Sequence, residues 1–156
     1  KGVPAFYLPA LLASENDIKS FSMTGQRRDL NREKFKSENL SAVLNNPESN
    51  ANKNLKYLRN AMDVRSELKQ FHPCSEMKCL SKGRSDIVVI KRGKGPESVF
   101  AIHNMTENKI NYQLNDNDLP KIIDNDFNTH DFLTSTKYNC KNISLDPFQV
   151  IWLSAL

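Results

Sequence analysis

The hydrophobic and polar positions divide the first third of the chain into three segments. Residues 2–12 form an almost unbroken apolar run, a pattern typical of a strand buried on both faces of a parallel sheet. Residues 13–36 are polar and show little periodicity, which predicts a long loop. A short helix is expected next, with Ser37 as its N-cap and its end at residues 45–47.

The clearest helical periodicity runs from about Asn50 to Gln70. The apolar residues of this segment recur at roughly helical spacing, and they are Leu55, Leu58, Met62, Val64, Leu68 and Phe71. We interpret this stripe as a packing face. The helix should end at His72-Pro73, because the residue before a proline disfavours the helical conformation.

After Pro73 the pattern changes to short apolar segments separated by turn residues. The predicted strands are Met77–Leu80, Asp86–Lys91, Ser98–Asn104, Lys109–Leu114, Phe132–Thr134, Asn142–Leu145 and Gln149–Leu153. Short strands with no helix between them predict an antiparallel sheet or a small sandwich. The chain is therefore expected to divide into residues 1–73 and an all-β part, residues 74–156.

Composition and charge exclude several classes of protein. Of the 156 residues, 38% are hydrophobic and 26% charged, with acidic and basic residues mixed to a net charge of +4. This favours a mildly basic surface over a nucleic-acid-binding stripe. No stretch approaches the roughly 20 apolar residues of a membrane span. Three cysteines without a framework spacing predict reduced thiols in a cytoplasmic protein without a metal site.

Candidate catalytic groups are few. Asp17 and Asp29 share the polar segment, but nothing in the pattern pairs them across a cleft, and solvated or salt-bridged roles are favoured. Cys74 and His72 lie together without a third partner for a nucleophilic triad. We therefore assign no catalytic residue to this chain.

The distinctive feature is the segment Thr24–Arg32, in which Arg27, Arg28 and Arg32 surround Asp29. A guanidinium group donates a planar fork of hydrogen bonds that suits carboxylates, phosphates and vicinal hydroxyls. Asp29 can hold one guanidinium and leave another free for a ligand. The alternative is a solvated basic loop with an internal salt bridge.

Five motifs in order resemble the sucrose phosphorylase-like subgroup of glycoside hydrolase family 13, in the α-amylase superfamily. They are Gly2–Tyr7 with Leu11–Asp17, Thr24–Arg32, Leu58–Pro73, Val99–Thr106 and Leu145–Leu153. The resemblance implies an α+β chain: the last strand, acceptor loop and last helix of a (β/α)8 barrel over residues 1–73, and a small antiparallel β-domain over residues 74–156. Lys1 leads directly into the apolar run, so we interpret the chain as a C-terminal fragment.

The resemblance also implies a function. Such enzymes transfer an α-glucosyl group with retention, using an Asp nucleophile and a Glu acid/base that would lie upstream of Lys1. Arg28 then matches the family arginine near the acceptor or phosphate, with Arg27 and Arg32 as further candidates. The expected partners are a small α-glucoside and inorganic phosphate, without a cofactor, a nucleic acid or a membrane.

Three alternatives stay open at this point. The parent enzyme can be an α-glucoside hydrolase of the same family, with water as acceptor. The chain can instead be a non-catalytic carbohydrate-binding or interaction module built from its β part. A basic nucleic-acid binder is the third, although few aromatic residues accompany the arginines.

Overall fold

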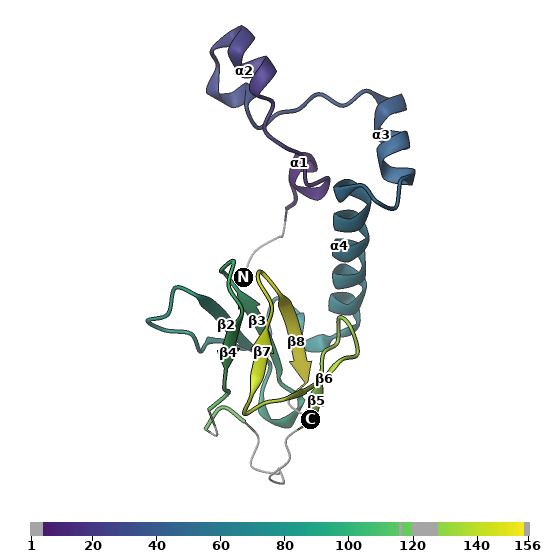
Figure 1. Cartoon of the computed structure of the whole chain (residues 1–156). Helices are drawn as coiled ribbons and strands as arrows, with labels where there is room; N and C mark the ends of the chain where they lie inside the picture. Colours follow the sequence, from purple (N-terminus) through teal and green to yellow (C-terminus); the bar gives the residue numbers. More distant parts are fainter. Residues whose placement is uncertain (1–4, 116, 120–127, 155–156) are drawn as a thin grey trace. The chain divides into compact units, whose positions relative to one another are not determined.

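The computed structural model describes residues 5–115, 117–119 and 128–154 (Figure 1). Its contacts divide the chain into two compact units, Gly2–Asp63 and Val64–Leu156, here called the N-terminal and C-terminal units. The N-terminal unit is helical and the C-terminal unit is mainly antiparallel β-structure, so the predicted α+β class is confirmed. The division lies within a helix, before the predicted boundary at residues 73 and 74. That domain assignment, including the end of a barrel, stays a prediction.

The apolar run at the start forms a helical turn, and the predicted strand is wrong for its described residues. Helix α1 spans Leu8–Leu11 and has Pro9 in its first turn, where the missing N–H of proline costs no hydrogen bond. A buried parallel strand needs neighbouring strands to satisfy its backbone groups, and all strands of the described chain lie from Met77 onward. Residues 2–4 of the predicted strand lie outside the described residues.

The predicted loop over residues 13–36 contains a helix. Helix α2 spans Ile18–Thr24 and is followed by a 3-10 turn, η1, at Arg27–Asp29. Asp17 caps α2, because its carboxylate accepts the backbone N–H of Ser20 at 2.9 Å. Gly25 ends the helix in the left-handed conformation, with φ of 66°. Both capping signals are present in the sequence, but the helix is too short for its apolar period to be recognised.

Two further helices follow the predicted order. Helix α3 spans Ser37–Asn45, so the helix is confirmed, but Lys36 stands at the N-cap in place of Ser37 and gives no side-chain cap. Helix α4 spans Asn50–Glu67, and the short 3-10 turn η2 at Lys69–Phe71 follows it. Of the residues of α4, only Ala51 is buried. The predicted apolar stripe of α4 is therefore partly exposed and does not form a core.

All but one of the predicted strands are confirmed in the C-terminal unit. They are β1 (Met77–Cys79), β2 (Ile87–Arg92), β3 (Val99–Asn104), β4 (Ile110–Tyr112), β7 (Ile143–Leu145) and β8 (Val150–Ser154). A four-stranded antiparallel sheet has the order β1-β2-β3-β8, and β4 pairs with β7 (Figure 1). Across the sheet, Val89 lies opposite Ile102, which lies opposite Ile151. This register brings apolar side chains of neighbouring strands onto one face.

These strands enclose the hydrophobic core of the protein. Its buried members are Ile87, Val89, Phe100, Ile102, Tyr112, Leu114, Cys140, Ile143, Leu145, Ile151 and Leu153. Most of them come from strands that are far apart in sequence, so the core forms only when the whole sheet is paired. Burial raises the pKa of the Cys140 thiol to about 12, because the thiolate would lose its hydration. All three cysteines are free of disulfide bonds.

The predicted strand at Phe132–Thr134 is wrong, because these residues form a turn. Strands β5 (Asn128–His130) and β6 (Lys137–Asn139) flank the turn and pair with each other. The carboxylate of Asp131 is fully buried and accepts the backbone N–H of Trp152 at 2.7 Å and the hydroxyl of Thr134 at 2.7 Å. An aspartate that binds the backbone a few residues on favours a turn over a strand.

The turn η2 is attached to the sheet by side chains of the C-terminal unit. The rings of Phe71 and Trp152 lie 4.6 Å apart, centroid to centroid. The guanidinium of Arg92 donates to the backbone oxygens of Gln70, at 3.1 Å, and His72, at 2.8 Å. These contacts explain why the residues after Asp63 group with the β-structure.

Candidate functional site

Two of the three predicted binding arginines, Arg27 and Arg28, lie on the turn η1, and Arg32 follows it. The backbone N–H of Asp17 donates to the carbonyl oxygen of Leu30 at 2.7 Å, which joins the two ends of the segment around α2 and η1. The hydroxyl of Thr24 donates to the carboxylate of Asp29 at 2.6 Å. Local hydrogen bonds therefore connect α2 to η1 and to the residue after it.

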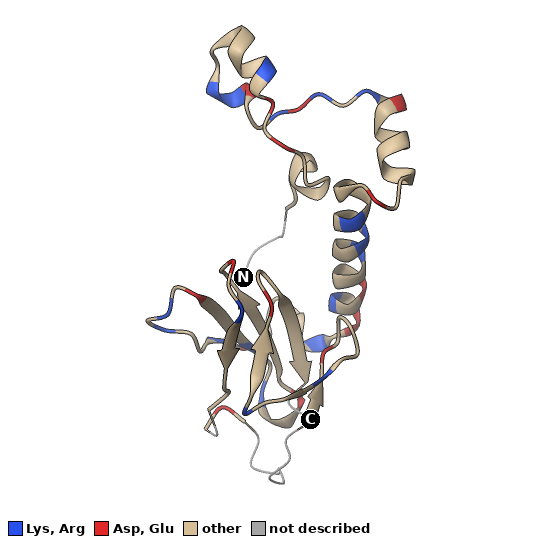
Figure 2. Cartoon of the chain, viewed as in Figure 1, with Lys and Arg blue, Asp and Glu red and all other residues tan. Residues whose placement is uncertain are grey.

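The guanidinium groups of Arg27, Arg28 and Arg32 are exposed. Within the residues that the structure describes, none of the three makes a recorded ion pair or side-chain hydrogen bond. Within the described residues, the Asp29 carboxylate accepts the hydroxyl of Thr24 and has no ion pair with any of the three arginines. Arg27 and Arg28 thus share the turn η1, which follows α2, and Arg32 lies three residues beyond the end of this turn. Figure 2 colours the Lys and Arg residues of this segment blue.

This arrangement can bind an anion. Guanidinium groups without a protein partner keep their hydrogen-bond donors available, and each offers a planar pair of N–H groups to a phosphate or carboxylate. At an exposed site, however, water competes strongly and such contacts contribute little by themselves. The turn therefore needs further walls before it can bind a ligand tightly.

The two carboxylates considered as a catalytic pair are both engaged by hydroxyl groups. Asp17 accepts the hydroxyl of Ser20 at 2.5 Å as well as its backbone N–H. These hydrogen bonds lower the pKa of the Asp17 carboxyl, because they stabilise its charged form. A general acid needs the opposite shift, so Asp17 is suited to capping and not to proton donation.

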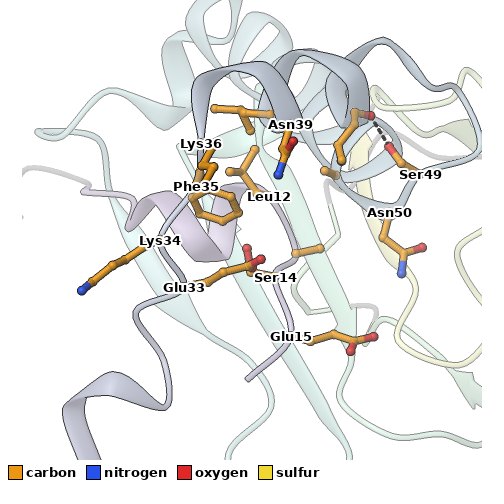
Figure 3. A pocket seen from close by; sticks show the side chains of 14 residues that line it. Leu12, Ser14, Glu15, Glu33, Lys34, Phe35, Lys36, Asn39, Ser49 and Asn50 are labelled. Carbon is orange, nitrogen blue, oxygen red and sulfur yellow. Dashed lines mark hydrogen bonds between the residues drawn. The ribbon is translucent and has the colours of Figure 1, made fainter. Parts of the chain in front are cut away.

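A cavity of about 450 Å³ lies elsewhere in the N-terminal unit (Figure 3). Residues of α3 and the start of α4 line it, together with Leu12–Glu15, which follow α1, and Glu33–Lys36. None of the three arginines lines this cavity. Sequence reasoning missed it, because its walls come from separate segments that had been interpreted as loop or as helix surface.

The end of α1 sets one wall of this cavity. The backbone N–H groups of Ala13 and Ser14 donate to the carbonyl oxygens of Ala10 and Pro9, the pattern of a Schellman motif. Ala13 has φ of 48°, a left-handed conformation that glycine adopts more easily at this position. The side-chain amide of Asn54, on α4, donates to the carbonyl oxygens of Ala10 and Leu11 at 3.0 and 2.9 Å. Ser14 is therefore held firmly, and its hydroxyl oxygen is buried without a recorded partner.

The cysteine and histidine side chains of the C-terminal unit do not form a reactive pair. The ring nitrogen Nδ1 of His72 accepts the backbone N–H of Cys74 at 3.2 Å, which is a turn contact. The hydroxyl of Ser81 lowers the pKa of the exposed Cys79 thiol. In the described part of the chain, no cluster of His, Cys, Asp or Glu could hold a metal ion, and no helix is long and apolar enough to cross a membrane.

The chain is similar to two curated proteins, both named glucosylglycerate phosphorylase. It is 33% identical to the protein of Allomeiothermus silvanus over 107 residues, which are 69% of this chain and 19% of the relative. It is 21% identical to the protein of Escherichia coli over 152 residues, which are 97% of this chain and 25% of that relative. The chain thus spans a quarter or less of the length of these relatives. No protein-family model matches it.

Solved structures share the fold. The crystal structure of AmyP in complex with maltose superposes with a TM-score of 0.55 at 16% identity, over 68% of this chain and 21% of that one. A structure of the trehalulose synthase MutB gives a TM-score of 0.52 at 12% identity, and the match covers 73% of this chain and 19% of that one. At these identities the likeness concerns the fold alone. It agrees with the predicted α+β chain that ends in an antiparallel β-domain, and the chain's relatives by sequence are phosphorylases.

Proposed function

We propose that this chain is the C-terminal part of a retaining α-glucosyl-transferring phosphorylase that acts on a small α-glucoside with inorganic phosphate as acceptor. The observation that carries the proposal is the similarity to two glucosylglycerate phosphorylases, each covered only in part. Their name makes glucosylglycerate the first substrate to test, beside sucrose, which the motif resemblance favours. A cytoplasmic location is part of the same proposal.

In this proposal the chain supplies binding groups and the catalytic carboxylates lie outside it. Retaining transfer needs two carboxyl groups on opposite sides of the scissile bond, one as nucleophile and one as acid/base. Asp17 and Asp29 are committed to hydroxyl partners within their own turn. Residues 1–73 would complete a (β/α)8 barrel, and residues 74–156 would form the β-domain behind it.

Arg28 is the proposed binding residue for phosphate or for the acceptor, with Arg27 and Arg32 beside it. Their exposure and lack of recorded partners support this role, because a binding guanidinium must have donors free. Walls from the rest of the barrel would exclude water and strengthen these contacts.

The first test uses the chain as it stands. The purified chain should release no glucose 1-phosphate from glucosylglycerate or sucrose in the presence of phosphate. Phosphorolysis by the chain alone would show that the carboxylates have been placed wrongly.

The second test uses the complete enzyme that the proposal implies. Arg28→Ala should lower kcat/KM for phosphate roughly 10–100-fold, as expected for the loss of a charge-assisted hydrogen bond. Arg59→Ala is the matched control, because Arg59 is an exposed arginine of α4 outside the turn. An equal kcat/KM for phosphate in Arg28→Ala and Arg59→Ala would show that Arg28 does not bind phosphate. Release of free glucose at the same rate without phosphate would favour the hydrolase instead.

A carbohydrate-binding module is the second candidate, favoured by the self-contained core of the C-terminal unit. It predicts that the isolated chain binds maltose through residues of that unit. Isothermal titration with maltose, followed by spectra that locate the perturbed amides, separates this candidate from the phosphorylase fragment.

A further inference from the structure

Phe148 combines an unfavourable backbone conformation with an exposed aromatic side chain. It is the third residue of a turn between β7 and β8, closed by a hydrogen bond from the backbone N–H of Gln149 to the carbonyl oxygen of Asp146 at 3.1 Å. Its φ is 54°, in the left-handed region that glycine adopts easily and that strains a bulky residue. Its side chain is 65% exposed, so packing within the described chain offsets little of this strain. Strained residues of this kind cluster at functional sites.

The turn of Phe148 is attached to the loop that joins β3 to β4 (Figure 1). The backbone N–H of Phe148 donates to the carbonyl oxygen of Thr106 at 3.0 Å. The side-chain amide of Asn104, which is 2% exposed, donates to the carbonyl oxygens of Asp146 and Asn108 at 2.8 and 2.7 Å. These hydrogen bonds hold the strained turn in place, so the position of the aromatic ring is preorganised.

A second apolar side chain is exposed on the same pair of loops. Met105 is 54% exposed and precedes Thr106, to which Phe148 is hydrogen-bonded. We call Met105 and Phe148 the apolar platform. Aromatic residues and methionine are enriched at protein interfaces, where they supply much of the contact area. Two such side chains fixed on a preorganised support therefore indicate an interaction surface.

The outer face of the four-stranded sheet continues from the apolar platform. Val88, His103 and Val150 lie opposite one another on β2, β3 and β8, at the end of the sheet that carries both loops. Each is next to a core residue in sequence, so its side chain points away from the core, to the other face of the sheet. All three are half-buried. The surface next to the platform is therefore mainly apolar as well.

One segment of this chain already packs on that outer face. Trp152 shares the face of Val150, because the two residues are two positions apart on β8, and Phe71 of η2 lies against its ring. The turn η2 follows α4, which the proposed function assigns to the end of the barrel. The match to the two glucosylglycerate phosphorylases leaves at least three quarters of each relative outside it. The remainder of the barrel is thus the occupant that continues an existing contact along the same face.

We propose that the apolar platform and the adjoining outer face of the sheet are the surface on which the C-terminal unit docks against the part of the parent enzyme that lies outside this chain. The inference rests on the proposed function, which supplies the occupant, and it adds the residues that make the interface. Burial of the Phe148 ring in that interface offsets the strain of its backbone. A second copy of this chain is the competing occupant, and the experiment separates the two.

The first experiment measures the oxidation of two methionines by hydrogen peroxide, in this chain alone and in the complete enzyme. Met77, on the edge strand β1, is 61% exposed and is the matched control for Met105. Mass spectrometry should show similar rates for both in the chain alone. In the complete enzyme Met105 should oxidise at least about tenfold more slowly, with Met77 unchanged, because oxidation depends on exposure of the sulfur.

Two results of this experiment would overturn the proposal. One is an equal rate of Met105 oxidation in the chain alone and in the complete enzyme. The other is a rate for the chain alone that falls as its concentration rises, since a second copy would then cover the platform.

The second experiment uses the strain of Phe148. Phe148→Gly should not lower the urea midpoint of the chain alone, because glycine accepts the positive φ and the lost side chain is exposed. In the complete enzyme the same variant should restore most of the oxidation rate of Met105. Ser135→Gly is the matched control, because Ser135 is an exposed turn residue with φ of 61° outside the platform, and it should leave Met105 protected. A lower midpoint, or unchanged protection in Phe148→Gly, would contradict docking through this residue.

An assay of phosphorolysis keeps this proposal apart from the proposed function. Protection of Met105 in a complete enzyme that releases no glucose 1-phosphate would support the docking surface and refute the phosphorylase. Phosphorolysis by an enzyme in which Met105 oxidises as fast as in the chain alone would support the phosphorylase and refute the docking surface.

Discussion

Both units of this chain contain large apolar residues, but the C-terminal unit buries many more of them than the N-terminal unit does. In the C-terminal unit a connected core of fully buried side chains joins several strands. In the N-terminal unit only Leu12 and Ala51 are buried among the described residues, while Phe6, Ile18 and Met23 are all more than half exposed. Burial of apolar surface is the main stabilising contribution to folding. The C-terminal unit therefore has its own source of stability, and the N-terminal unit relies on caps and hydrogen bonds, including those from Asn54 to Ala10 and Leu11.

This difference agrees with the proposed function. Exposed apolar residues that gather in one large patch often mark a surface that another protein segment covers. If the N-terminal unit completes a barrel, the apolar residues that face the other barrel strands are exposed when those strands are absent. The C-terminal unit closes its own core, although Met77, Met105 and Phe148 of this unit are also more than half exposed.

The largest expected effect comes from removing a core side chain. Phe100 is fully buried, so Phe100→Ala should lower the free energy of unfolding by about 3–5 kcal/mol. Val43, on α3, is 44% exposed. Val43→Ala should therefore change the free energy of unfolding by no more than about 0.5 kcal/mol. Urea unfolding followed by the fluorescence of the single tryptophan, Trp152, measures both. Similar losses for the two variants would mean that the helical unit shares the core's stability.

The next effect concerns the buried carboxylate of the C-terminal unit. Asp131→Ala should cost about 2–3 kcal/mol, because the backbone N–H of Trp152 would stay buried without an acceptor. Asp131→Asn keeps one side-chain oxygen and should cost less. The same urea experiment ranks the two variants. Equal stability of Asp131→Ala and the native chain would show that the β5–β6 turn does not need this side chain.

Two glycines allow a matched comparison between the units. Gly93 has φ of 80°, and an added Cβ would lie 2.9 Å from Cγ of Gln70. Gly93→Ala should therefore cost about 2 kcal/mol, from left-handed strain and from the displaced glutamine. Gly25 has φ of 66° with open space around it, so Gly25→Ala adds strain alone. We expect Gly25→Ala to reduce the helical circular dichroism without moving the urea midpoint, and Gly93→Ala to move the midpoint.

The smallest effect is the pH dependence of α2. The pKa of Asp17 is lowered from 3.8 in the folded chain, because Ser20 donates two hydrogen bonds to the carboxylate. A lowered pKa means that the cap contributes fully above the unfolded value of 3.8 and is lost as the pH falls through the lower folded value. The amide signal of Ser20 should follow this titration by NMR, while Asp17→Asn should abolish the dependence. An unchanged Ser20 signal down to about pH 2 would argue against the cap.

The period of the apolar residues was enough to predict α3, α4 and most strands of the C-terminal unit. For these elements the local pattern and the final burial agree, as in β2, where Ile87 and Val89 alternate with less buried residues. The turn at Phe132–Thr134 was mistaken for a strand, since its apolar residues suggested one. The burial of Asp131 beneath that turn depends on β8, which lies further along the chain.

Some features of the candidate sites could likewise be predicted from the sequence, and others could not. The sequence by itself determined that three arginines lie within one short segment, because their spacing alone brings them together. The contact between the Thr24 hydroxyl and the Asp29 carboxylate lies within the same short segment, although the spacing of the residues did not predict it. Only the tertiary structure decided that Ser14, Asn39 and Asn50 line one cavity, because the residues after α1, α3 and the start of α4 must first come together. Contacts between distant segments depend on how the helices and strands pack, and no local pattern of residues records that packing.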